Sequence, residues 1–160
     1  MGTRTKRKPQ LALRLDAAAP DVAARWRDGA SLACLGATVT LRLDTACKEA
    51  MFADGQLHLP LPPEATPRQI QDAAESWLRA YAVRVISAQV VMAARPLRRA
   101  PPAVSLSFAA RGSWAQPHDR GLRFHWRLIE QPPEVIAQVV ERAVAALPKV
   151  EDSLDLFALA

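Results

Sequence analysis

Cysteine and histidine are scarce in this chain, which has two cysteines and three histidines among 160 residues. Cys34 and Cys47 form no Cys-x-x-Cys pair and have no obvious metal partners in the sequence, a usage that suits a reduced intracellular protein. Long apolar runs are also lacking, and no apolar segment follows the basic residues near the N-terminus. The sequence therefore predicts neither a signal peptide nor a membrane span, and it favours a cytoplasmic location.

Positive charge exceeds negative charge, with a formal net charge of +5 and an isoelectric point near 9.9. A basic protein can bind nucleic acid through phosphate contacts that weaken as salt is added. Arginine far outnumbers lysine, however, as it also does in proteins encoded by genomes of high GC content. No aromatic pattern of a known nucleic-acid-binding module is visible. Charge alone therefore leaves both interpretations open.

Apolar spacing predicts an α+β fold in which a small, largely antiparallel sheet packs against a long first helix and a second helix. Alternating apolar residues predict strands over 38–43, 103–108 and 122–128. Asp54-Gly55 predicts a tight hairpin, because glycine accepts the positive φ that such a turn needs.

Helical spacing of apolar residues predicts a first helix from 67 to about 94 and a second over 134–147. Thr66 and Gln69 are placed to cap the first helix at its start. Residues 1–10 are expected to form a basic flexible tail, and 11–160 a single domain.

Several short segments occur in an order that is typical of one family. They are Leu35-Gly36, Asp54-Gly55, Trp126-Arg127-Leu128, Pro132-Pro133 and Val139-Val140. Together they resemble the YgjP-like (SprT-related) zinc metallopeptidases, in which a strand runs through a Pro-Pro turn into the active-site helix. The resemblance implies that the second helix of this chain is equivalent to that active-site helix.

In the family, this helix carries His-Glu-x-x-His, whose histidines bind zinc while the glutamate activates water. The resemblance places Arg142 and Ala146 at the two histidine positions, and Ala143 at the glutamate position. The third ligand position falls near Asp152. An arginine side chain has no lone pair to offer a cation, and alanine has no ligand atom. The resemblance therefore implies a family fold that has lost the zinc motif.

A possible binding face surrounds the expected cleft and consists of Arg111, Trp114, Arg120, Arg123, His125 and Arg127. Strand alternation predicts that Arg123, His125 and Arg127 share one face. Trp114 stands where the family has a smaller cysteine, and we expect its ring to fill the vacated metal cavity; the alternative is exposure to a partner. Arginine forks bind carboxylates and phosphates at two points. An acidic protein segment is the favoured partner, and nucleic acid the second choice.

The interpretation that follows is a catalytically inactive, bacterial-type relative of a zinc metallopeptidase that acts as a binding or regulatory module. It predicts no enzymatic activity, no cofactor, no bound metal and no membrane partner. Two alternatives stay open: a metal-dependent hydrolase with a rearranged site, and a nucleic-acid-binding protein that uses its basic face.

Overall fold

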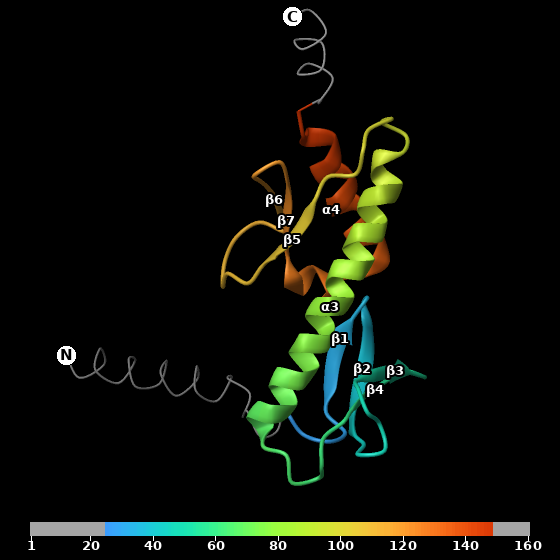
Figure 1. Cartoon of the computed structure of the whole chain (residues 1–160), viewed down its shortest axis with the longest axis vertical. Helices are drawn as coiled ribbons and strands as arrows, with labels where there is room; N and C mark the ends of the chain where they lie inside the picture. Colours follow the sequence, from blue (N-terminus) through green and yellow to red (C-terminus); the bar gives the residue numbers. More distant parts are fainter. Residues whose placement is uncertain (1–24, 149–160) are drawn as a thin grey trace, which may run out of the picture. The chain divides into compact units, whose positions relative to one another are not determined.

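The structure of this protein is a computed structural model that describes residues 25–148 (Figure 1). Within that range the elements are β1 (Ser31–Cys34), β2 (Ala37–Leu43), β3 (Met51–Ala53), β4 (Gln56–Leu59), α3 (Pro67–Ala94), β5 (Val104–Ser107), β6 (Ala115–His118), β7 (Gly121–His125), the 3-10 helix η1 (Trp126–Glu130) and α4 (Pro133–Ala146). The expected α+β class is confirmed, although the described strands form two small sheets rather than one. The expected tail at 1–10 and the position of Asp152 lie outside the described residues.

The described residues divide into two compact units, so the single domain expected over 11–160 stays a prediction. The first unit contains residues 25–31 and 40–74, and the second contains 32–39 and 75–148. No helix within 25–148 combines the length and the apolar character that crossing a bilayer requires. The expected cytoplasmic location stays a prediction.

The first unit is built around β4, which pairs in parallel with β2 and antiparallel with β3. The expected hairpin is confirmed at Asp54 and Gly55, which join β3 to β4 with φ values of 52° and 73°. Leu41 of β2 and Leu57 and Leu59 of β4 are fully buried, as the alternation of apolar residues predicts. The polar residues between them, including His58, are therefore directed away from these buried leucines.

The first helix begins as the sequence predicts. The Thr66 hydroxyl accepts a hydrogen bond from the Gln69 backbone N–H, and the Gln69 side chain accepts one from the Thr66 N–H. This reciprocal pair satisfies two donors that the first turn of a helix cannot satisfy internally. The most buried residues of α3 recur every four positions: Ile70, Ala74, Leu78, Ala82, Ile86, Val90 and Ala94.

The second unit contains a sheet in which β7 lies between β5 and β6, parallel to the first and antiparallel to the second. Helix α4 contacts β6. The start of β7 needs glycine, because a Cβ at Gly121 would lie 2.3 Å from the Ala103 carbonyl oxygen. This close approach lets Leu122 N–H donate to the same oxygen at 2.8 Å.

The strand expected over 122–128 ends earlier, at His125, and the chain then turns through η1. A strand that continued to Ile129 would direct Leu128 and Ile129 to opposite faces. In the 3-10 turn both are fully buried, which explains why the turn replaces the strand. The strand expected over 103–108 also ends one residue early, at Ser107, and Phe108 is 56% exposed, with the Arg79 guanidinium 4.8 Å from the centre of its ring.

Both ends of α4 are fixed by distant segments of the same unit. Before its start, the Leu35 and Gly36 N–H groups donate to the carbonyls of Ile129 and Glu130 at 2.7 and 3.0 Å. At its end, the Arg99 guanidinium donates to the carbonyls of Val144 and Leu147 at 2.8 and 3.3 Å. Helix α4 has no basic residue in its own last turn, so Arg99 supplies the cation that its carboxyl end favours.

Arg99→Ala should lower the free energy of unfolding by about 1 to 2 kcal/mol, because it leaves carbonyls of α4 without their charged donor. Chemical denaturation measures this change. Arg98→Ala is the matched control, since Arg98 is exposed beside it and its loss should cost less than about 0.5 kcal/mol. Equal losses for the two variants would contradict a capping role for Arg99.

Candidate functional site

A cavity of about 320 Å³ lies in the second unit. One wall consists of residues 113–117 and Leu122, and the other consists of Val139, Arg142, Ala143 and Ala146 of α4. Its volume is at the lower end of the range for small-ligand pockets, roughly 300 to 1,000 Å³. The cavity therefore has room for one or two side chains of a partner.

The periodicity of α4 directs these residues to the cavity. Ile136, Val140 and Val144 recur every four positions and are almost fully buried. Ala143 lies three positions after Val140, on the flank next to this buried stripe, and it is half-buried. Arg142 and Ala146 are exposed and line the cavity from the same flank.

Trp114 lines this cavity but does not fill it. Its side chain is 40% exposed, and the cavity beside it remains open. The expectation that a large ring would close the vacated space is therefore wrong. The Trp114 carbonyl accepts a hydrogen bond from the His125 N–H at 2.9 Å, and the indole ring stands edge-on to the His125 ring at 6.1 Å. These contacts fix Trp114 at the wall of the cavity.

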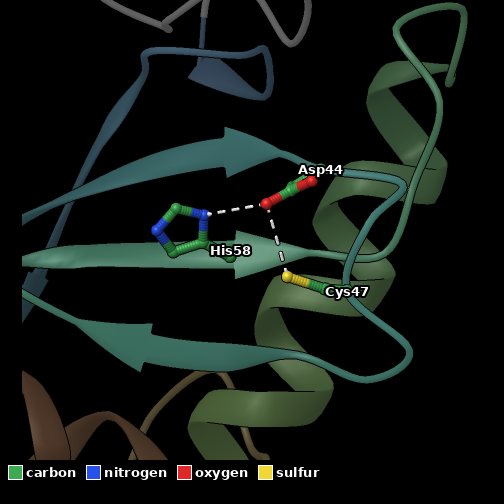
Figure 2. Close-up of side chains that lie close together, drawn as sticks. All are labelled: Asp44, Cys47 and His58. Carbon is green, nitrogen blue, oxygen red and sulfur yellow. Dashed lines mark hydrogen bonds and ion pairs between the residues drawn. The ribbon is translucent and has the colours of Figure 1, made fainter.

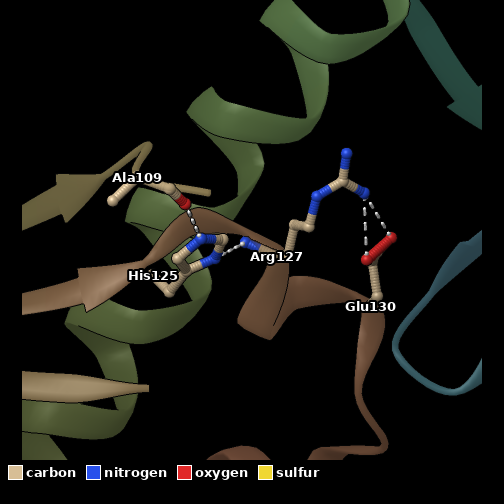
Figure 3. Close-up of polar contacts among 4 residues, drawn as sticks. All are labelled: Ala109, His125, Arg127 and Glu130. Carbon is tan, nitrogen blue, oxygen red and sulfur yellow. Dashed lines mark hydrogen bonds and ion pairs between the residues drawn. The ribbon is translucent and has the colours of Figure 1, made fainter. Parts of the chain in front are cut away.

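His125 has a structural role (Figure 3). Its Nδ1 accepts a hydrogen bond from the Arg127 N–H at 3.2 Å, which caps η1, and its Nε2 lies 2.7 Å from the Ala109 carbonyl oxygen. A ring that accepts at Nδ1 and donates at Nε2 is a neutral imidazole with its proton on Nε2. Both nitrogens are therefore engaged within the chain.

Arg127 is also engaged within the chain. It lies on η1, and its guanidinium pairs with Glu130 at 3.3 Å (Figure 3) and lies 4.7 Å from the centre of the Trp126 ring. The prediction of a shared strand face holds for Arg123 and His125, which alternate with buried residues along β7, and is wrong for Arg127, because the strand ends at His125. Arg123 itself hydrogen-bonds His118 across the β6–β7 pair.

The structure thus brings together only part of the expected set. Trp114 joins Arg142, Ala143 and Ala146 at the cavity, whereas Arg111 and Arg120 are exposed and do not line it. Arg142 is the one charged residue among those that line the cavity. The sequence alone suggested only that Arg142 stands where the family has a zinc-binding histidine. It did not indicate that Arg142 places a positive charge at the cavity wall. The helical spacing of Arg142 from the buried stripe was the available signal.

Comparison with protein families identifies the family of the chain but does not extend to the positions of Arg142, Ala143 and Ala146. A family model for a metallopeptidase domain matches residues 6–141, which is most of the chain. The chain therefore belongs to the YgjP-like metallopeptidase-domain family. The match ends one residue before Arg142. No curated protein and no solved structure matches the chain.

The residues that line the cavity do not fit the zinc ion that the family implies. None of them is a histidine, cysteine, aspartate or glutamate, the side chains that bind zinc in proteins. A protonated guanidinium at Arg142 would also repel a cation placed there. No catalytic step through a metal can be derived for this cavity.

The open cavity predicts that the family motif can be restored without loss of the fold. Arg142→His, Ala143→Glu and Ala146→His together should change the free energy of unfolding by less than about 1 kcal/mol, because 142 and 146 are exposed. Thermal unfolding measures this. Val140→His on the fully buried stripe is the control and should cost roughly 3 kcal/mol or more. Collapse of the triple variant would contradict an open cavity.

Proposed function

We propose that this protein is a family member without the zinc chemistry of its relatives, and that it binds an acidic segment of a partner protein in the cavity beside α4. The observation that carries the proposal is a cavity wall in which Arg142 is the one charged residue and no side chain is of a type that binds zinc. The regulatory role expected from the sequence would follow from such binding.

The character of the cavity favours a particular kind of segment. Trp114, Leu122 and Val139 offer apolar surface, while Arg142 offers a guanidinium at the exposed flank of α4. An apolar side chain could be buried against that surface, and a neighbouring carboxylate could pair with the guanidinium. The preferred ligand is therefore a segment in which apolar and acidic residues are adjacent.

Nucleic acid is the weaker alternative. Phosphate-driven binding requires many unpaired cations along one surface. Three of the arginines of the second unit are instead engaged within the chain: Arg99 with the end of α4, Arg123 with His118, and Arg127 with Glu130. Arg142 alone contributes charge to the cavity. One guanidinium beside apolar surface suits a carboxylate better than a phosphate backbone.

The proposal is tested with labelled peptides of alternating leucine and glutamate, with leucine-glutamine peptides as the uncharged comparison. Fluorescence anisotropy should show that the acidic peptide binds more tightly. Arg142→Glu should weaken its binding at least about tenfold, about 1.4 kcal/mol, because it reverses the only charge in the cavity. Arg142→Met, which keeps much of the side-chain length, should show a smaller loss of the same sign.

Arg120→Glu is the matched control, because it changes the net charge equally at an exposed residue outside the cavity. It should leave peptide binding nearly unchanged. An equal loss for Arg120→Glu would mean that binding is diffuse and not centred on the cavity. Tighter binding of oligothymidylate would favour the nucleic-acid alternative, and chelator-sensitive cleavage of the peptide would favour a hydrolase with a rearranged site.

A further inference from the structure

Three side chains able to bind a metal come together in the first unit, separate from the cavity described above. Asp44, Cys47 and His58 each offer one ligand atom, and all three atoms lie within 4.8 Å of one another (Figure 2). Asp44 follows β2, Cys47 lies in the connection to β3, and His58 belongs to β4. No local motif pairs Cys47 with His58, because His58 is eleven positions away along the chain and on another strand.

The fold positions Asp44 so that one carboxylate oxygen accepts a backbone hydrogen bond and the other faces Cys47 and His58. Its Oδ1 accepts a hydrogen bond from the Ala46 N–H at 2.9 Å, which fixes the rotamer. Its backbone carbonyl accepts a hydrogen bond from the Cys47 N–H at 3.2 Å. This bond closes the turn that directs the Cys47 thiol toward the Asp44 carboxylate. The remaining oxygen, Oδ2, lies 3.5 Å from Cys47 Sγ and 3.6 Å from His58 Nδ1 (Figure 2).

The parallel pairing of β2 with β4 places His58 in the cluster. Leu43 lies opposite Leu59, and the Asp44 N–H continues the ladder by donating to the Leu59 carbonyl at 2.9 Å. Because Leu57 and Leu59 are buried, alternation turns His58 outward toward Asp44. The Asp44 and His58 side chains are 37% and 27% exposed, so an ion can reach them from solvent.

Two of the three separations fit a tetrahedral ion, and the third lies within 4.8 Å. With zinc bonds of about 2.0 Å to oxygen and nitrogen and about 2.3 Å to sulfur, the edges of a tetrahedron are about 3.3 to 3.6 Å. The two separations measured from Asp44 Oδ2 are 3.5 and 3.6 Å. One thiolate, one imidazole and one carboxylate suit Zn²⁺ or Co²⁺, whereas Mg²⁺ and Ca²⁺ prefer sites made of oxygen alone.

We propose that Asp44, Cys47 and His58 form a site for one Zn²⁺ ion, with a fourth position open to water. This replaces the expectation of a protein without bound metal and is independent of the cavity at Arg142. On binding, the Cys47 Sγ–H proton passes to solvent and the sulfur bonds to the ion. The ion takes the place of the proton in the Cys47–Asp44 hydrogen bond, and through His58 it ties the β2–β3 connection to β4.

The two cysteines differ in a way that the test can use. Burial and the charge of Glu130 raise the pKa of the Cys34 thiol to about 11, and its side chain is buried. Desolvation, a hydrogen bond to Asp44 and the charge of Asp44 also raise the pKa of Cys47, which is only half-buried. Cys47 is therefore the thiol that a reagent can reach, and zinc should protect it.

The test uses the full chain, reduced and freed of metal, titrated with ZnCl₂ and with CoCl₂. We expect one Zn²⁺ per chain by calorimetry, a near-ultraviolet thiolate-to-cobalt charge-transfer band, and protection of Cys47 from thiol labelling by zinc. MgCl₂ should produce none of these effects. Cys47→Ala and His58→Gln should each weaken zinc binding at least tenfold, and Cys47→Ala should abolish the cobalt band. Asp44→Asn keeps the Oδ1 contact to Ala46 and should weaken binding less.

Cys34→Ala and His118→Gln are the matched controls, because they change the same residue types outside the cluster. Both should bind zinc as the unaltered protein does, and so should Arg142→Glu. A cobalt band that survives Cys47→Ala but disappears in Cys34→Ala would overturn the proposal. Absence of the cobalt band from the unaltered protein, or unchanged zinc affinity in both Cys47→Ala and His58→Gln, would also overturn it.

Discussion

Burial of one apolar stripe on α4 determines what the cavity of this protein can contain. Ile136, Val140 and Val144 are excluded from water, and this burial fixes the rotation of the helix about its own axis. Once the rotation is fixed, Arg142, Ala143 and Ala146 must line the flank that faces residues 113–117. Arg99 and the Leu35-Gly36 backbone fix the two ends of the same helix. The chemistry of the cavity is therefore set by which side chains occur on one flank of one helix.

The same flank explains why the space remains open. Alanines at 143 and 146 add little volume, and the exposed guanidinium of Arg142 need not enter the cavity to stay hydrated. Trp114 is fixed at the wall by its backbone contact to His125. The proposed binding role uses this open pocket.

In the first unit, strand pairing brings together metal-binding side chains that no local sequence motif predicts to be close. Asp44 and Cys47 lie in one turn, but His58 reaches them only because β2 and β4 pair in parallel. Alternation along β4 decides which side His58 faces. The register of the strand pair places His58 opposite Arg42, two residues before Asp44, and so brings His58 close to Asp44. A shift of one residue in the register of β4 would turn His58 toward the buried face of the sheet and separate it from Asp44 and Cys47.

The sequence by itself determined the α+β class, the capped start of α3, the hairpin at Asp54-Gly55 and the absence of histidine from α4, because each depends on residues close together in the chain. Only the tertiary structure decided that β7 ends at His125, that Trp114 leaves the cavity open, and that Arg127 pairs with Glu130. It alone decided that Cys47 meets His58. Local periodicity is repeated along the sequence and can be read there, whereas the meeting of distant side chains depends on how whole elements pack and pair.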